Sequence, residues 1–281
     1  MSEIKIAVIG GSGIYKLEAI KVKKTIKVMT PFGETSADIM ECDIEGVPFY
    51  FLPRHGLGHK LTPSEVNYRA NIFALKKLGV TTIVSISAVG SLQEELAPKH
   101  FVLVDQFIDW TKGLRKRSFF DNGMVGHVSA ANPIETSLQK RLFEACQRAG
   151  VKSHLGGSYI CIEGPQFSTR SESKIYRGFG ASVIGMTNVP EAFLAKEAGM
   201  AYATVAMVTD YDCWKDEHCT VQEIMDVMKS NYISAQKFVI EAIPDLVKNP
   251  VQFNPENQYA VITDPSLLNT SHKEILEVLL K

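Results

Sequence analysis

The sequence predicts a single α/β domain in which a central mixed β-sheet is flanked by helices. Short runs that are apolar throughout alternate with segments of helical periodicity, and strands of this kind are typically buried on both faces of a sheet. A hairpin at residues 37–53, with Glu45-Gly46 as its turn, makes the predicted sheet mixed rather than purely parallel. The apolar runs that predict strands are residues 4–10, 81–89, 101–108, 158–164, 181–187 and 201–209.

Helix starts are marked by a hydroxyl residue followed three positions later by glutamate, which is the spacing of a capping box. The pattern occurs at Thr62 with Glu65, Thr169 with Glu172, Thr220 with Glu223, and Ser271 with Glu274. The first predicts a helix that begins at Pro63 and runs to Gly79. The last predicts a short C-terminal helix.

From Val221 onward, apolar residues recur at alternating steps of four and three, which predicts a long helix with one buried stripe. The stripe comprises Met225, Met228, Tyr232, Ala235, Val239 and Ala242. We interpret it as core packing and not as a cofactor-binding motif. The looser segment after Pro244 indicates a main domain over residues 1–248. Residues 249–281 then form a C-terminal extension that packs against the same domain or a neighbouring subunit.

Composition argues against several classes of partner. Thirty basic and 31 acidic residues leave a net charge of −1, so no global field attracts a nucleic-acid backbone or an anionic membrane. Five cysteines, odd in number and without a C-x-x-C pair, argue against a disulfide framework. The N-terminus lacks the apolar stretch of a signal peptide, and no run approaches the ~20 residues of a membrane span. We therefore expect a soluble, cytoplasmic protein.

Small, polar and cationic residues gather where the predicted strands end, and open α/β sheets bind ligands at such ends. The first strand ends in GGSG, where backbone N–H groups and the Ser12 hydroxyl can form an anion nest, although a plain strand-to-helix turn fits equally well. The segment matches neither G-x-G-x-x-G nor a P-loop. Arg54 and His55 end the hairpin and suit phosphate oxygens, with a solvated strand end as the alternative. Ser87 ends another strand with a further hydroxyl.

Two later strand ends carry bulkier side chains. Phe167 lies on a Gly-Pro turn, where ordinary core packing is the alternative interpretation. Met186 and Thr187 end the next strand, just before a helix opened by Val189-Pro190-Glu191.

A pair of carboxylates follows the last strand. Asp210 and Asp212 are two residues apart, so in an extended segment they project from the same face. Two close carboxylates behind an apolar strand raise one pKa, which keeps a proton available for donation. Such a pair suits the N6/N7 edge of adenine, although a helix cap and a solvated aspartate would also explain it.

Taken in order, these segments closely resemble the purine nucleoside phosphorylase family, in particular its members that act on 5′-methylthioadenosine. The matching segments are GGSG, PRHG, SAVGSL, IEGPQFSTRSES, GMTNVPEAFLAKEAG and MVTDYDCW. The resemblance covers about residues 4–247 and implies a nucleoside phosphorylase domain over residues 1–248. It implies phosphorolysis of methylthioadenosine to adenine and 5-methylthioribose 1-phosphate, in purine and methionine salvage. Inorganic phosphate is the co-substrate, with no metal and no organic cofactor.

The resemblance also implies residue roles. Phosphate is expected to contact Ser12, Arg54, His55, Ser87, Ala88 and Thr187, while Phe167 and Met186 face the purine and the ribose, and Asp210 and Asp212 face the base edge. Asp210 and His55 are the expected catalytic residues. Ser168 and Val221 occupy positions where the family sets selectivity. His127 matches a position that reaches a neighbouring subunit's pocket, which implies a trimer or a hexamer.

Three alternatives stay open at this point. A phosphorylase for 6-oxopurine nucleosides, such as inosine, guanosine or methylthioinosine, is the nearest. A nucleosidase that uses water as the nucleophile is the second. The third is a nucleotide sensor without catalytic activity.

Overall fold

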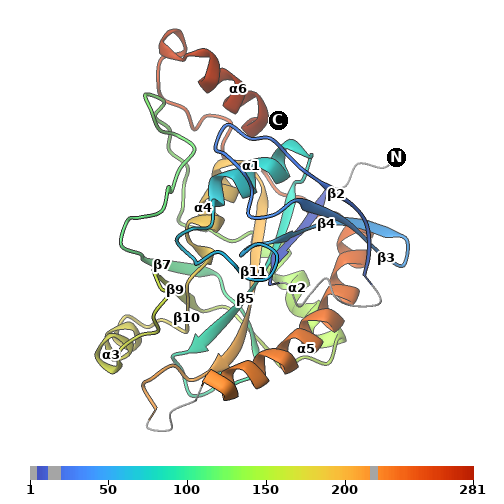
Figure 1. Ribbon diagram of the computed structural model, residues 1–281, viewed down its shortest axis with the longest axis vertical. Coiled ribbons are helices and arrows are strands. Elements are labelled where there is room, and N and C mark those ends of the chain that lie inside the picture. Colours follow the sequence, from blue (N-terminus) through green and yellow to red (C-terminus); the bar gives the residue numbers. More distant parts are fainter. Residues whose placement is uncertain (1–4, 12–19, 216–220) are drawn as a thin grey trace.

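The expected α/β fold is confirmed by the computed structural model, which describes residues 5–11, 20–215 and 221–281. One large mixed sheet lies between two layers of helices (Figure 1). Its strands are β1 (Ile6–Gly10), β2 (Lys21–Ile26), β3 (Ile39–Ile44), β4 (Val47–Pro53), β5 (Thr82–Ser91), β6 (Phe101–Leu103), β7 (Gln106–Trp110), β8 (Ser153–Leu155), β9 (Ser158–Ile162), β10 (Val183–Gly185) and β11 (Ala201–Asp210).

Strand β5 is the centre of the sheet, whose main path runs β2-β3-β4-β1-β5-β10-β9-β7. Along one edge β5 pairs with β11 over nearly its whole length. Along the other edge its first half pairs with β1 in parallel, and its last two residues pair with β10 in antiparallel. Within the described part of the chain, residues 86–89 of β5 therefore have no neighbouring strand on that edge.

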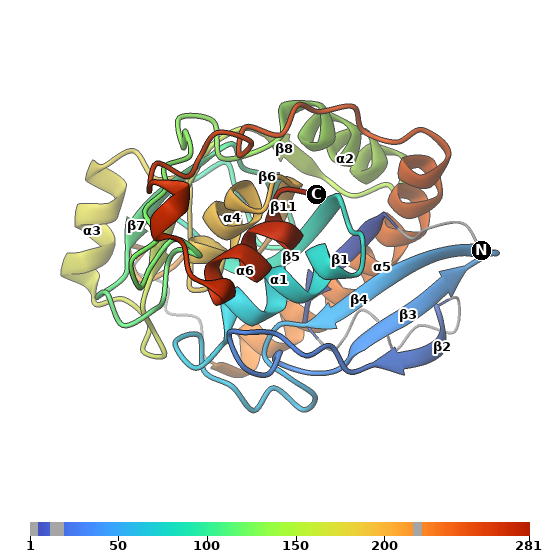
Figure 2. The ribbon, with the colours of Figure 1, turned by 90° about the horizontal axis from the view of Figure 1, so that it is seen from above.

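Helices cover both faces of the sheet (Figure 2). On one face α1 (Tyr68–Lys77) packs between α4 (Asn188–Glu197) and α6 (Thr270–Leu279). On the other face α2 (Thr136–Arg148) packs against α5 (Val221–Lys248), which crosses β1, β3, β4 and β11. Helix α3 (Arg170–Gly178) lies beside the end of the sheet formed by β7, β9 and β10, and a 3₁₀ turn, η1 (Pro265–Leu267), precedes α6.

The strand predictions hold with one exception, and the hairpin is confirmed with Glu45 and Gly46 both at positive φ. The predicted strand 101–108 is two strands in different parts of the sheet, because β6 pairs with β8 and β11 whereas β7 pairs with β9. Between them the Asp105 N–H donates to the Gly157 carbonyl, which redirects the chain. The sequence analysis did not anticipate β2, whose residues are almost all exposed.

The prediction that the first helix begins at Pro63 is wrong. Thr62 and Glu65 form only half of a capping box: the Glu65 carboxylate accepts the Thr62 N–H and hydroxyl, but the Glu65 N–H donates to the Thr62 carbonyl and closes an isolated turn. Helix α1 begins five residues later, at Tyr68, with the Asn67 side chain accepting the Ala70 N–H. The intervening segment places the Ser64 hydroxyl on the carboxylate of Glu163, a tertiary contact that local capping chemistry does not encode.

Of the other three predicted caps, one is confirmed, one is replaced by neighbouring residues and one lies outside the described residues. Thr169 with Glu172 is confirmed as a capping box at α3. Helix α6 instead begins at Thr270, with Asn269 and His272 forming the box that was expected of Ser271 and Glu274. Thr220 lies outside the described residues. Helix α5 continues through Pro244 to Lys248.

A continuous hydrophobic core joins the sheet to both helical layers and includes Ile275 and Leu279 of α6. The C-terminal segment is tied down further by Asn257, whose side-chain amide donates to the carbonyls of Glu197 and Leu279. The division of the chain at residue 248 stays a prediction. Among the described residues, no helix is both long and apolar enough to cross a membrane.

Replacing Gly185 of β10 with alanine is expected to destabilise the protein. An added Cβ would lie 2.0 Å from the Tyr159 hydroxyl and 2.5 Å from its ring, and Tyr159 is fully buried. Forced overpacking of this kind costs about 2 kcal/mol. We expect a melting temperature several degrees lower, measured by calorimetry.

Gly178→Ala is the matched control. Gly178 ends α3 with open space around its Cα and without a positive φ, so alanine is expected to leave stability unchanged or slightly raised. Equal melting temperatures for the two variants would contradict the close contact at Gly185.

Candidate active site

A cavity of about 330 Å³ lies beside the unpaired stretch of β5. This volume is in the range of small-molecule sites. Predicted site residues that line it are Arg54, His55, Ser87, Ala88, Phe167, Ser168, Met186, Thr187, Asp210 and Asp212. A place where the strand order changes is where α/β sheets usually bind ligands.

Arg54 lines one wall of this cavity, and its side chain is only 2% exposed. Its Nε and Nη2 donate to the two carboxylate oxygens of Glu191, at 2.7 and 2.9 Å. Nη2 also donates to the Ser85 hydroxyl at 2.7 Å, and Nη1 donates to the carbonyl of Ile86 at 3.0 Å. The guanidinium is therefore fixed, and its charge is balanced by a buried carboxylate.

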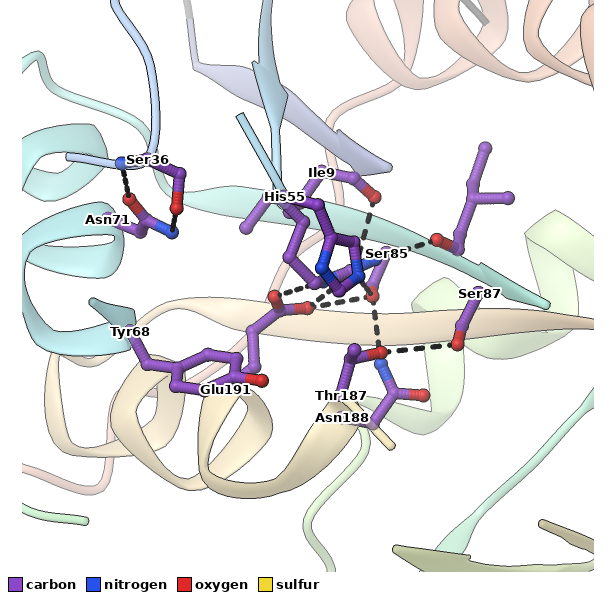
Figure 3. A network of polar contacts seen from close by, with 12 residues as sticks. Ile9, Ser36, His55, Tyr68, Asn71, Ser85, Ser87, Thr187, Asn188 and Glu191 are labelled. Carbon is purple, nitrogen blue, oxygen red and sulfur yellow. Dashed lines mark hydrogen bonds and ion pairs between the residues drawn. The ribbon is translucent and has the colours of Figure 1, made fainter. Parts of the chain in front are cut away.

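Glu191 was read from the sequence only as a residue that opens a helix. In the structure Glu191 is a buried residue of α4 that also accepts a hydrogen bond from the Ser85 hydroxyl at 2.8 Å (Figure 3). The Tyr202 hydroxyl donates to it as well, at 2.9 Å. Asn188 completes the network by donating to the oxygens of Ser85 and Tyr202. A glutamate in the first helical turn usually faces solvent, so local pattern gave no signal for this role.

His55 follows Arg54 and presents one ring nitrogen to the cavity wall. Its Nδ1 lies 2.9 Å from the Leu61 carbonyl, so the proton belongs on Nδ1 and Nε2 is left as the second polar atom. Burial, together with the neighbouring charge of Arg54, lowers the pKa of His55 to about 4. The ring is therefore neutral at pH 7. It stacks on His59 with ring centroids 4.3 Å apart.

Hydroxyl groups line the gap in the sheet. The hydroxyl oxygens of Ser87 and Thr187 are 3.3 Å apart (Figure 3). The Tyr159 hydroxyl lies 3.4 Å from that of Ser87. Ala88 is the exposed residue of an otherwise buried stretch of β5, because it faces the cavity. This wall thus combines hydroxyl donors with strand backbone that lacks a neighbour, which is an arrangement suited to an anion.

The carboxylate pair forms another part of the cavity. Asp210 accepts the Thr209 hydroxyl on Oδ1 at 2.6 Å and the Asp212 N–H on Oδ2 at 2.9 Å. Burial raises the pKa of Asp210 in spite of these bonds. Burial also raises the pKa of Asp212, and the neighbouring charge of Asp210 adds to that effect. Both groups hold a proton more tightly than free aspartate does.

The two aspartates meet for a reason other than the one predicted. Alternation along a strand does not apply, because β11 ends at Asp210 and Asp212 adopts a left-handed conformation with φ of 49°. This turn brings the Asp212 N–H back onto the Asp210 carboxylate. Among the described residues, Oδ2 of Asp212 is buried without a hydrogen-bond partner, so this acceptor is left unsatisfied.

Arg115 is a further residue that the sequence analysis missed. It lies on the long segment between β7 and α2, is 5% exposed, and pairs through Nε with Glu163 at 2.9 Å. Its Nη1 donates to the carbonyls of Met186 and Val189, both at 2.7 Å. Arg115 therefore fixes the β10–α4 turn, which carries Met186 and Thr187 into the cavity.

The interpretation of the α5 stripe as core alone is wrong for its first part. Ala235, Val239 and Ala242 are buried in the core, as expected. Met228 and Tyr232, however, line the cavity, because the first turns of α5 lie beside the end of β11, where the sheet ends.

Three predicted residues cannot be assigned to the cavity from the structure. Ser12 lies outside the described residues, and Val221 is described only as the first residue of α5. His127 is exposed and does not line the cavity of its own chain, and its N–H donates to the Ala260 carbonyl at 2.8 Å. Its role in a neighbouring subunit's pocket stays a prediction.

Comparison with known proteins identifies the family. A model described as "Phosphorylase superfamily" matches residues 5–244. The chain belongs to this superfamily. It is 48% identical to S-methyl-5′-thioadenosine phosphorylase of Geobacter sulfurreducens, over 98% of this chain and 97% of that protein. It is 46% identical to the protein of the same name from Thermofilum pendens, over 88% and 94%.

Solved structures of this superfamily share the fold. A crystal structure of methylthioadenosine phosphorylase from an antarctic soil metagenomic library superposes with a TM-score of 0.94 at 44% identity, covering all of both chains. Methylthioadenosine phosphorylase from Schistosoma mansoni in complex with adenine gives a TM-score of 0.82 at 36% identity, covering 88% of this chain and 93% of that one.

Removing the charge of Glu191 is expected to destabilise the fold. Glu191→Gln leaves Arg54 buried without its counter-charge, which costs about 3 kcal/mol. Urea unfolding measures the loss. Glu34→Gln is the control, because Glu34 pairs with Lys27 at the exposed surface and such pairs contribute little. An equal, small effect of both variants would show that the buried pair is not needed.

Proposed function

We propose that this chain cleaves 5′-methylthioadenosine by phosphorolysis, with inorganic phosphate as nucleophile. The observation that carries the proposal is one cavity that holds an anion-binding wall and a pair of carboxyl groups with raised pKa values. The relatives named above, and the solved structure with adenine, support the choice of substrate.

Phosphate binds at the wall formed by Arg54, His55, Ser87 and Thr187, with the Ala88 backbone and Ser12 as further contacts. One phosphate oxygen forms the new bond to C1′ as the bond from C1′ to N9 of the base breaks. The sugar becomes cationic in the transition state, and the adjacent phosphate anion stabilises that charge. The bonding electron pair leaves with the adenine ring.

Asp210 completes the reaction at the base. A purine that departs with an extra electron pair leaves faster when N7 receives a proton, and Asp210 supplies this proton from its buried carboxyl group. Asp212 accepts the exocyclic amino group on its unpartnered oxygen. Phe167 covers the purine and Met186 the ribose. Ser168 and Val221 set selectivity.

The chemistry calls for no metal or organic cofactor. We further propose that the protein acts in the cytoplasm as a trimer or hexamer, in purine and methionine salvage. His127 then reaches the pocket of a neighbouring subunit, in keeping with its exposure on the outside of its own chain. Nucleic acids and membranes are not partners.

Phosphate dependence is the first test of the proposal. Cleavage of methylthioadenosine is expected to rise with phosphate concentration to saturation and to be negligible in phosphate-free buffer, with the sugar 1-phosphate detected by phosphorus NMR. Equal cleavage with and without phosphate would identify a hydrolase. Tight nucleotide binding without any turnover would identify a sensor.

Asp210→Asn tests the choice of base. An amide cannot supply the proton and suits a 6-oxopurine better, so kcat/KM for methylthioadenosine should fall about 10²-fold or more and that for inosine much less. Asp226→Asn, on the exposed face of α5, should change neither. An unaltered preference in D210N would remove Asp210 from base recognition.

A further inference from the structure

Tyr232 of α5 places its hydroxyl group at the end of β1. A Cβ added to Gly11 would lie 3.0 Å from that oxygen, so the phenol rests directly on the Gly11 backbone. The ends of β1 and β4 are side by side here, because the Arg54 N–H donates to the Gly10 carbonyl at 3.1 Å. Tyr232 therefore contributes to the wall from which Arg54 and His55 enter the cavity.

The Tyr232 hydroxyl has no hydrogen-bond partner within the described part of the chain. Burial raises the pKa of this phenol, so it keeps its proton and serves as a donor. Its position is fixed from one residue away, where the Asn231 side chain donates to the Val208 carbonyl at 2.8 Å. A fixed tyrosine that lines a cavity with an unused O–H is suited to bind a ligand acceptor.

Little net positive charge is available at this wall, so a neutral hydrogen-bond donor matters for binding an anion. Glu191 balances the charge of Arg54, and most of the guanidinium donors are already used within the protein. His55 is neutral at pH 7 because burial lowers its pKa to about 4. A bound anion is thus held mainly by individual O–H and N–H groups and only weakly by net positive charge. The loss of one donor therefore lowers the affinity for the anion.

We propose that the Tyr232 hydroxyl donates a hydrogen bond to the phosphate co-substrate. The proposal rests on the phosphorolysis proposed above, and it assigns a phosphate-binding role to a residue of the α5 stripe. A tyrosine that merely filled space against Gly11 would not need its hydroxyl.

Tyr232→Phe tests this role, because it removes one oxygen and keeps the ring. The KM for phosphate should rise roughly tenfold or more, since a hydrogen bond to a charged ligand is lost. The KM for methylthioadenosine, and kcat at saturating phosphate, should stay near those of the unaltered protein. Titration calorimetry with inorganic phosphate alone should show the same loss of affinity without relying on turnover.

Tyr259→Phe is the matched control, because Tyr259 is exposed and is not among the residues that line the cavity. An unchanged phosphate affinity in Y232F would overturn the proposal, and so would an effect confined to the nucleoside. Failure of the proposed function is a separate result, since it appears as phosphate-independent cleavage by the unaltered protein.

Gly11→Ala tests the geometry independently. Its new Cβ presses on the Tyr232 hydroxyl at 3.0 Å, whereas the nearest ring carbons are 3.6 and 3.7 Å away. G11A should therefore weaken phosphate binding and lower the melting temperature, and Y232F should restore much of that melting temperature in the double variant. Strictly additive melting-temperature losses would place the hydroxyl elsewhere.

Discussion

The buried ion pair between Arg54 and Glu191 is the interaction on which the rest of the site depends. It connects the end of β4 to the start of α4, and through Ile86 and Ser85 it connects both to the central strand. Two charges removed from water are tolerated only when their hydrogen bonds are nearly complete, and this network satisfies that condition. The pair therefore gives the cavity a rigid floor, but it leaves little free positive charge for a ligand.

The two ends of the cavity have opposite electrostatic requirements. In the proposed reaction, the phosphate end must hold an anion without a large excess of positive charge, and the neutral hydroxyl donors of Ser87 and Thr187 meet that requirement. At the base end a carboxyl group must keep its proton near neutral pH, and burial of Asp210 and Asp212 favours the protonated form. Both depend on exclusion of water, because hydrogen bonds and pKa shifts are larger where the dielectric constant is low.

Much of this arrangement could be predicted from the sequence, for identifiable reasons. Continuous apolar runs specify buried strands, and the polar residues that follow them must lie at strand ends, which is why Arg54, Ser87, Thr187 and Asp210 were found together. The capping box at Thr169 is a purely local signal, and it held. The hairpin turn at Glu45-Gly46 is equally local.

The misses share a different cause, which is tertiary contact. Glu191 looks like an ordinary acid in a first helical turn until Arg54, 137 positions away, is folded against it. Tyr232 fits the spacing of core residues along α5. It lines the cavity because the sheet ends beneath this part of the helix. Thr62 and Glu65 have the spacing of a capping box, yet Ser64 is bound to Glu163 and the helix begins only at Tyr68. No local pattern contains these partners.

The change of partner along β5 has a consequence for how the protein responds to its ligands. Residues 86–89 have no neighbouring strand on one edge. The Arg54 guanidinium donates to the Ile86 carbonyl there, and any backbone group left without a partner is available to solvent or to a bound molecule. In the proposed reaction, the phosphate anion occupies this gap. A ligand that binds only the folded protein stabilises it by mass action. The enzyme is therefore expected to resist heat best with its ligand bound.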